Sequence, residues 1–172
     1  DFTYGITNHF SYKQFDLDVL LQGVKGGDIE FLTARFIGTN NLDWAQLSES
    51  VSNRWKSPDH PGNGIYPRVG GPGAAAQVAF NETQSDRWLR DGSYLRIRNV
   101  TLGYNLPGSL ARKAKLGYVR IYATAENLWT FTHYVGYNPD VSINGESAGS
   151  PGVDYATYPL ARTFTLGINL GL

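Results

Sequence analysis

The chain has 172 residues, with 15 basic and 15 acidic side chains, no cysteine and no methionine. A formal net charge of zero excludes a protein that gathers nucleic acid through its electrostatic field, and the lack of cysteine excludes disulfides and thiolate metal sites. No apolar run approaches the roughly 18 residues of a membrane-spanning helix, and no segment resembles a signal peptide. Because a translated chain begins with methionine, we interpret Asp1 as a cleavage product or as the edge of a longer chain.

Aromatic residues and glycines indicate a β-rich protein that meets a membrane. The chain contains 20 glycines, 11 tyrosines, 8 phenylalanines and 4 tryptophans. Tyr and Trp favour membrane–water interfaces, where an apolar ring and a polar tip are both accommodated. The mean hydropathy of −0.31 is compatible with that location, because a barrel strand exposes only every second residue to lipid.

The first two predicted strands, Phe2–Tyr12 and Phe15–Val24, alternate between apolar and polar residues and meet at a tight turn near Lys13. In the second strand, Asp16 and Asp18 share the polar face. Two carboxylates would be costly in a dry core, but they are ordinary on a face that meets water. The pattern therefore predicts strands with one apolar face and one wet face.

A long segment, 25–93, separates the second strand from the third. Asn41 is placed to cap a short helix, Asp43–Trp55, whose apolar residues fall on one stripe, and the prolines and glycines from Pro58 to Gly73 predict irregular chain. Four aromatic residues of this segment are candidates for contact with a substrate or with a partner that covers the barrel: Trp44, Trp55, Tyr66 and Trp88. The alternative is that they pack the loop against itself, because a loop of this length needs a core to stay ordered.

The third and fourth strands are predicted at Tyr94–Leu106 and Tyr118–Trp129, with Pro107–Gly117 between them. In the third strand the apolar alternation slips by one residue, which predicts a β-bulge near Asn99. Four charged residues of these strands fall on the wet face and are predicted to point into a barrel lumen: Arg96, Arg98, Arg120 and Glu126. On such a face, charges pair across strands or contact whatever fills the barrel.

The last predicted strand, Ala161–Leu172, follows a second long connection, 130–160. Its apolar residues alternate strictly with small or polar ones, and they are Phe164, Leu166, Ile168, Leu170 and Leu172. This alternation puts every large apolar side chain on one face. An apolar outer face and a small, polar inner face are what the closing strand of a membrane β-barrel needs.

Short and long connections alternate along the chain, as they do in outer-membrane barrels, whose periplasmic turns are short and whose extracellular loops are long. Segments 25–93 and 130–160 are therefore predicted to be extracellular. Five strands do not close a barrel, and two open edges would leave on the order of 20 backbone groups unpaired in lipid. The prediction is an all-β fold in which residues 1–172 form the five antiparallel C-terminal strands of a larger transmembrane barrel.

Seven segments resemble the SusC/RagA type of TonB-dependent outer-membrane transporter, in that family's order and over nearly the whole chain. They are Phe15–Gly23 (FDLDVLLQG), Asn53–Trp55, Tyr66–Arg68, Asp91–Pro107 (DGSYLRIRNVTLGYNLP), Val119–Phe131 (VRIYATAENLWTF), Gly136–Asp140 (GYNPD) and Tyr158–Leu170 (YPLARTFTLGINL). One departure is Leu172, because members of the family usually end in an aromatic residue.

The resemblance implies a barrel of about 22 strands that crosses the bacterial outer membrane many times. It also implies an N-terminal plug, a segment that contacts the TonB complex, and a SusD-like surface lipoprotein that covers the barrel, none of which lies in these residues. The implied activity is import of large nutrients, oligosaccharides or peptides, by a protein that is not an enzyme. The implied partners are these components and outer-membrane lipid, without nucleic acid, cofactor or metal.

Other motifs in the chain give little indication of a catalytic or metal-binding site. Gly145–Gly149 (GESAG) has the letters of a hydrolase nucleophile elbow, but no histidine follows it and its flanks are loop-like. The three histidines lie far apart, at His9, His60 and His133, which predicts no metal site. Four residues of the last loop offer oxygen ligands for Ca²⁺, namely Asp140, Asn144, Glu146 and Asp154. Their spacing fits no EF-hand, so we expect an ordinary polar loop.

Two alternative functions stay open at the level of sequence. A soluble β-sandwich, such as a surface carbohydrate-binding module, would need the wet face to pack as a second apolar layer, and the charges on that face argue against it. A passive porin-like barrel without a plug would have the same strands. Only sequence outside these residues would separate such a barrel from an active transporter.

Overall fold

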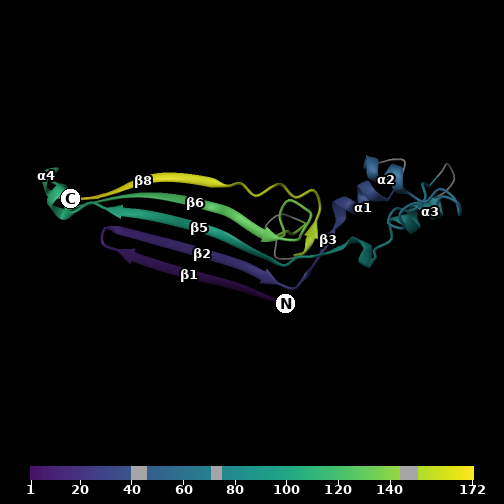
Figure 1. Ribbon diagram of the computed structural model, residues 1–172, viewed down its shortest axis with the longest axis horizontal. Coiled ribbons are helices and arrows are strands. Elements are labelled where there is room, and N and C mark those ends of the chain that lie inside the picture. Colours follow the sequence, from purple (N-terminus) through teal and green to yellow (C-terminus); the bar gives the residue numbers. More distant parts are fainter. Residues whose placement is uncertain (40–45, 71–74, 144–150) are drawn as a thin grey trace. The chain divides into compact units, whose positions relative to one another are not determined.

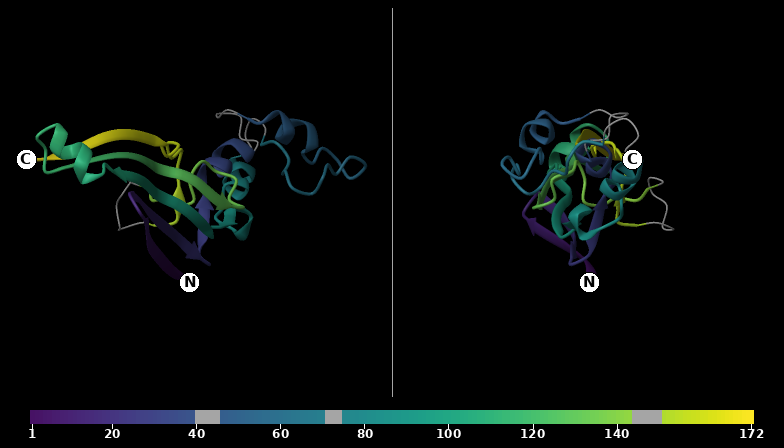
Figure 2. Two further views of the ribbon diagram at one scale, coloured as in Figure 1. Left: turned by 60° about the vertical axis from the view of Figure 1, so that its left-hand side comes forward. Right: turned by 90° about the vertical axis from the view of Figure 1, so that its right-hand side faces the viewer.

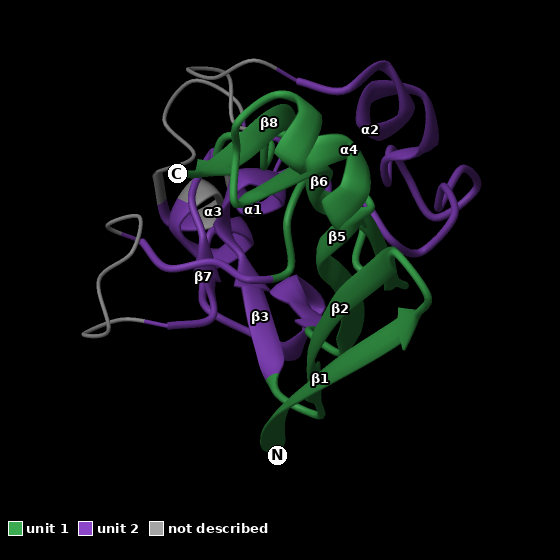
Figure 3. Ribbon diagram, turned by 90° about the vertical axis from the view of Figure 1, so that its left-hand side faces the viewer, with its two compact units in different colours: residues 1–27, 92–139, 158–172 green, residues 28–91, 140–157 purple. Residues whose placement is uncertain are grey.

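The computed structural model describes residues 1–39, 46–70, 75–143 and 151–172. Within them the chain forms two compact units, which Figure 3 shows in different colours. Unit 1 comprises Asp1–Gly27, Gly92–Pro139 and Tyr158–Leu172, and unit 2 comprises Asp28–Asp91 and Asp140–Thr157. Unit 2 therefore lies within the two long connections of the sequence.

Unit 1 is a five-stranded antiparallel sheet with the strand order β1-β2-β5-β6-β8 (Figure 1). Its strands are β1 (Phe2–Tyr12), β2 (Phe15–Lys25), β5 (Tyr94–Asn105), β6 (Tyr118–Thr132) and β8 (Thr163–Gly171). Strands that are far apart in sequence, such as β2 and β5, pair side by side (Figure 1), and Figure 2 shows the sheet from two further directions. The antiparallel five-stranded sheet that the alternation predicts is therefore present.

Short connections join strands at the end of the sheet where the C-terminus lies in Figure 1. Between β1 and β2, Tyr12 pairs with Phe15 and Lys13 has a φ of 54°, so two residues make the turn. β5 and β6 are joined through a short helix, α4 (Gly108–Lys113), for which the sequence shows no periodic signal. Pro107 precedes this helix with a φ of −52°, a value that the proline ring imposes and that a helix start accepts.

The β-bulge predicted near Asn99 is confirmed. In the β2–β5 pair, Leu20 faces Asn99 and Leu21 faces Ile97, so Arg98 is the extra residue. The β5–β6 pair is irregular at the same place. The bulge shifts the alternation of β5 by one residue, which lets the apolar residues on both sides of it share one face of the sheet.

The pairing register puts most of the large apolar residues of the five strands on the same face, which we call the outward face; exceptions on the opposite face include Leu20, Val24, Tyr94 and Tyr122. From β1 to β8 its residues are Phe2, Tyr4, Ile6, Asn8, Phe10, Tyr12, Phe15, Leu17, Val19, Leu21, Gly23, Lys25, Leu95, Ile97, Val100, Leu102, Tyr104, Val119, Ile121, Ala123, Ala125, Trp129, Phe131, Phe164, Leu166, Ile168 and Leu170. Many of the large side chains are exposed, and the exposed fractions reach 72% for Phe164 and 84% for Leu166. An exposed apolar layer of this extent needs an apolar environment.

The opposite face, which we call the inward face, is polar. Its residues include Thr3, Thr7, His9, Ser11, Asp16, Asp18, Gln22, Arg96, Asn99, Thr101, Asn105, Arg120, Thr124, Glu126, Thr130, Thr163, Thr165 and Asn169. The two faces therefore differ as the alternation in the sequence predicts.

Unit 2 contains a small three-stranded sheet that the sequence does not reveal. β3 (Asp28–Phe31) lies between β4 (Leu89–Asp91), which is antiparallel to it, and β7 (Val153–Asp154), which is parallel to it. The Glu30 N–H donates to the carbonyl of Gly152 at 2.8 Å. Strands of two to four residues are too short for an alternation to be detected, and a parallel pair joins segments that are distant in sequence.

The helices of unit 2 are short: α1 (Leu32–Gly38), α2 (Ser48–Asn53), α3 (Ala75–Asn81) and the 3-10 helix η1 (Asp86–Trp88). The predicted helix Asp43–Trp55 is wrong in its extent. α2 starts only after Leu47, whose ψ is 138°, and it ends where Arg54 becomes extended and pairs with Tyr66. The expected cap, Asn41, lies outside the described residues. In the described part of the chain, no helix has the length and apolar character to cross a membrane.

Candidate functional site

Aromatic residues mark both ends of the outward face. Toward the end with the long connections they are Phe2, Tyr4, Trp129 and Phe131, and toward the end with the short turns they are Tyr12, Phe15 and Tyr104. The ring centroids of Phe15 and Tyr104 are 4.8 Å apart, and those of Trp129 and Phe131 are 6.4 Å apart. Between the two sets the face is mainly aliphatic. Two aromatic girdles with an apolar band between them are typical of the outer surface of a transmembrane barrel.

The length of β1 fits a membrane. Phe2 and Tyr12 are the first and last of the 11 residues of β1, so they lie about 34 Å apart along an antiparallel strand. A strand tilted by about 40° would place the two girdles about 26 Å apart along the membrane normal, close to the height of the apolar band of an outer-membrane barrel. The outward face is therefore long enough to cross the hydrocarbon layer.

An ion pair crosses the inward face from β2 to β6. The Arg120 Nε donates to Asp16 Oδ1 at 3.2 Å, and its Nη2 donates to the second carboxylate oxygen, so the contact is bidentate. The Asn105 side-chain amide donates to Asp16 Oδ1 at 2.8 Å. On the same face, His9 Nδ1 lies 2.6 Å from Asp18 Oδ1. Both carboxylates that the sequence places on the wet face thus have partners on neighbouring strands.

Gly103 makes room for the Asp16–Arg120 pair. A Cβ at Gly103 would lie 2.6 Å from both Arg120 Nη2 and Asp16 Oδ1. We expect Gly103→Ala in the full-length protein to displace the pair and to lower the free energy of unfolding by about 1.5–3 kcal/mol, the range for hydrogen bonds to charged groups. The midpoint of urea unfolding in detergent measures this loss. The control is Gly5→Ala on the same face, where a Cβ would meet only Leu21 O, at 3.9 Å. Equal losses in both variants would contradict this role of Gly103.

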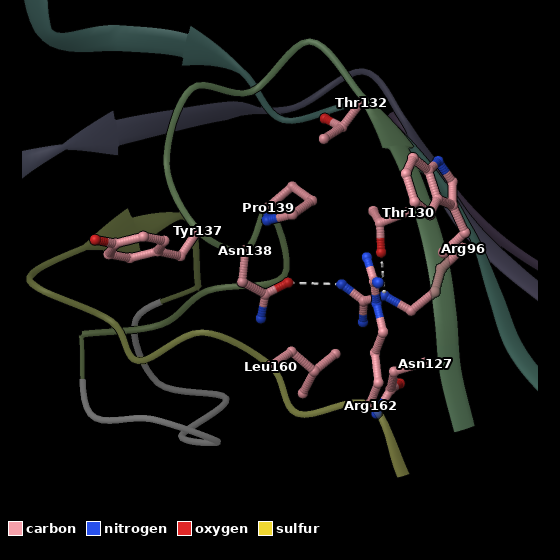
Figure 4. Close-up of a pocket in the computed structure, with 10 residues that line it drawn as sticks. Arg96, Asn127, Thr130, Thr132, Tyr137, Asn138, Pro139, Leu160 and Arg162 are labelled. Atoms are coloured by element: carbon pink, nitrogen blue, oxygen red, sulfur yellow. Dashed lines mark hydrogen bonds between the residues drawn. The ribbon is translucent and has the colours of Figure 1, made fainter. Parts of the chain in front are cut away.

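Arg96 connects the sheet to the chain that follows β6 (Figure 4). Its side chain is 1% exposed. The Nε donates to Thr130 Oγ1 at 3.0 Å and the Nη2 donates to Asn138 Oδ1 at 2.6 Å, and the guanidinium carbon lies 5.0 Å from the centroid of the Tyr94 ring. With Arg162, it lines a pocket of about 210 Å³. Arg96 therefore fixes Asn138 against the end of the sheet.

Asn138 is absent from the sequence-based candidates, although it lies in the Gly136–Asp140 segment. The available signal is an asparagine directly before Pro139, since Asn-Pro is typical of a chain reversal. The partner on β5, however, depends on the tertiary fold. Pattern reasoning alone does not supply such a partner.

The other charged candidates occupy different positions. Arg120 and Glu126 lie on the inward face by their pairing register. Arg98, the bulge residue, is exposed, and with Glu126 and Asn127 it lines a second pocket of about 270 Å³. The four predicted residues therefore do not form one cluster, and their orientation toward a barrel lumen stays a prediction.

Of the four aromatic candidates, Trp44 lies outside the described residues. Trp88 is 3% exposed, and Trp55 and Tyr66 are half-buried. A Cβ at Gly38 would lie 3.8 Å from the Trp88 ring and 4.0 Å from the Tyr66 ring, so these two rings pack around the same glycine. The positions of Trp88 and Tyr66 favour the packing alternative. Contact of any of the four with a substrate or a covering partner stays a prediction.

The GESAG motif, Gly145–Gly149, lies outside the described residues, as do the possible calcium ligands Asn144 and Glu146. Among the residues that the structure describes, no three His, Asp or Glu side chains are arranged to hold a metal ion.

No family model matches the chain. The TonB-dependent receptor P3 of Formosa agariphila is 36% identical over 175 residues, a match that covers 99% of this chain and 16% of that receptor. The TonB-dependent receptor SusC of Bacteroides thetaiotaomicron is 26% identical over 174 residues, covering 99% of this chain and 15% of SusC. The chain therefore spans about a sixth of the length of the curated relatives that it matches.

Two solved structures share the fold. The structure of the RagAB peptide transporter matches 93% of this chain and 16% of its own chain with a TM-score of 0.68 and 25% identity. The closed-closed state of the RagAB peptide importer matches 95% of this chain and 17% of its own with a TM-score of 0.70 and 24% identity. The sheet of unit 1 is thus a segment of a large antiparallel barrel, and the chain belongs to the TonB-dependent receptors of the SusC/RagA type.

Proposed function

We propose that this chain forms the C-terminal strands in the wall of a TonB-dependent active transporter in the bacterial outer membrane. The observation that supports this most strongly is the outward face, where exposed apolar residues lie between two aromatic girdles. In water an exposed apolar face of this extent would lead to association or aggregation, whereas the outer surface of a membrane barrel is apolar where it contacts lipid. The relatives carry the names of receptors and transporters rather than of enzymes, which supports transport without catalysis.

The proposed cargo is a large nutrient, a peptide or an oligosaccharide. The RagAB structures are named for peptide import, and the sequence resembles that type of transporter across nearly the whole chain. In this proposal a SusD-like lipoprotein covers the barrel from outside. The plug and the segment that contacts the TonB complex belong to the remainder of the receptor.

Each part of the chain has its own role in this proposal. The inward face, with the Asp16–Arg120 pair, lines the lumen and faces the plug. Unit 2 contributes to the extracellular mouth, where Trp55 is available for contact with cargo or with the lipoprotein. The short turn at Lys13 and the α4 connection lie on the periplasmic side, because short connections face the periplasm in such barrels.

Of the alternatives, the soluble β-sandwich is not supported, because the large apolar side chains of the outward face are exposed. The passive porin-like barrel differs from the proposal in one property, the dependence of uptake on TonB. In cells that carry the full-length receptor, we expect deletion of either the receptor or TonB to reduce growth on the imported nutrient to background. A panel of peptides and oligosaccharides as sole nutrient sources measures this and assigns the cargo class. Growth that survives loss of TonB but not loss of the receptor would contradict active transport and favour the porin-like barrel.

A further inference from the structure

The outward face ends, toward the long connections, in an open groove of about 550 Å³. Its lining includes Tyr4, Lys25, Trp129, Phe131 and His133, which come from β1, from the last residue of β2, and from β6 and the residue after it. Three of these side chains are aromatic, and two carry basic groups at the rim. This volume lies within the range of small-ligand pockets.

Gly23 makes room for the Tyr4 side chain of the groove. The end of the Tyr4 ring lies close against this glycine, since a Cβ at Gly23 would be 2.5 Å from both Tyr4 Cζ and the carbonyl oxygen of Tyr94. The Tyr4 hydroxyl donates to that carbonyl oxygen at 3.5 Å. A glycine at this position therefore lets the ring cross β2 and leaves open space between Tyr4 and Trp129.

The groove carries positive charge on a face that otherwise has none. Lys25 is the only charged residue among the outward-face residues of the five described strands, and no carboxylate is among them. Trp129 also lines the neighbouring pocket, where the Arg162 guanidinium carbon lies 5.1 Å from its ring centroid. Figure 4 shows Arg162 reaching from the segment before β8 into the neighbouring pocket, toward Arg96. The basic groups of the groove itself are those of Lys25 and His133. Basic groups beside aromatic rings at the edge of an apolar band favour an anionic, amphiphilic ligand.

We propose that this groove binds a phosphorylated lipid of the outer leaflet, with an acyl chain along Tyr4, Trp129 and Phe131 and the phosphate at the Lys25 amine. The inference rests on the proposed membrane location, because the groove then opens at the level of the lipid headgroups. Inorganic phosphate has no apolar part that could contact the aromatic side chains of the groove. A phosphorylated lipid can pair its phosphate with the Lys25 amine and place its acyl chain against the aromatic side chains.

The test is native mass spectrometry of the full-length receptor in detergent, titrated with dimyristoyl phosphatidic acid. Lys25→Gln is expected to weaken binding about fivefold, the factor for one basic side chain beside an anionic lipid. Trp129→Ala is expected to weaken it as well, because it removes a wall of the groove. The matched control is Lys13→Gln, which removes the lysine whose amine lies 5.3 Å from the ring centroid of Tyr12 at the other girdle, and it is expected to bind as the parent does. Dimyristoyl glycerol, which has the same chains and no phosphate, is expected to bind at least fivefold more weakly.

Several outcomes would overturn the inference. They are equal binding by Lys25→Gln and the parent, equal binding of the two lipids, or displacement of the lipid by an equal concentration of inorganic phosphate. Heat-modifiable migration on gels, measured in parallel, separates this failure from that of the proposed function. A receptor that migrates as a folded barrel but binds no phosphorylated lipid contradicts only the groove. A receptor that is soluble without detergent contradicts both.

Discussion

Replacing Leu166 by arginine in the full-length receptor is expected to block barrel assembly or to lower its stability by about 2–4 kcal/mol, the cost of a basic side chain on the lipid face near the middle of the bilayer. Leu166 is 84% exposed, lies in the middle of β8 and pairs with Ala123 on the outward face. No carboxylate is among the outward-face residues of the five described strands, so the guanidinium would have no counter-charge there. The folded fraction is measured from the heat-modifiable band of membrane extracts.

The control is Thr165→Arg, one residue earlier in the same strand. Thr165 pairs with Thr124 on the inward face, which we propose to line the water-filled lumen. We expect this variant to assemble to within about 0.5 kcal/mol of the parent, as is usual for a solvated surface position. If both arginine variants assembled equally well, or if only Thr165→Arg failed, the assignment of the two faces would be wrong.

The second large effect is expected at Arg96. Its guanidinium is buried and donates to Thr130 and Asn138, so Arg96→Ala removes two charge-assisted hydrogen bonds and leaves a cavity. We expect a loss of about 3 kcal/mol, concentrated in the connection that follows β6. Limited proteolysis of the receptor is expected to cut near Asn138 in the variant and not in the parent.

Arg98→Ala is the matched control for Arg96→Ala, since Arg98 is two residues away and exposed. We expect this substitution to leave both the protease resistance and the unfolding midpoint nearly unchanged. Cleavage near Asn138 that is equally fast in the two variants would show that Arg96 does not hold this connection.

The sequence was sufficient for the sheet because lipid and water impose a strict period of two. That period placed Leu166 and Ile168 outward and Thr165 inward, and a slip in it predicted a bulge near Asn99, where Arg98 is the extra residue. It did not reveal the pairing of Asp16 with Arg120. Shared placement on a face follows from alternation, whereas a partner on another strand, here across β5, depends on a strand order and register that only the folded sheet defines.

Unit 2 was harder to predict for a different physical reason. β3 and β7 pair in parallel over two residue pairs, Glu30 with Val153 and Phe31 with Asp154, and no local pattern announces a contact across that distance in sequence. α2 is shorter than its apolar stripe suggested, because Arg54 pairs with Tyr66 instead of continuing the helix. In both cases a tertiary contact overrode the local preference.

The most direct test of the membrane assignment is a cysteine scan of β8 in the full-length receptor, in a background without other cysteines. The receptor is reconstituted in liposomes so that the barrel lumen is open to the outside solution. A membrane-impermeant maleimide is then expected to label cysteines at Thr163, Thr165 and Asn169. It is expected to spare cysteines at Phe164, Leu166 and Ile168. When a fluorophore is attached to each of these three cysteines separately, before reconstitution, a quencher carried by the lipid is expected to quench it. This period of two in both signals is the predicted result. Labelling of all six positions by the water-soluble reagent, without lipid quenching at any of them, would contradict a membrane-spanning β8.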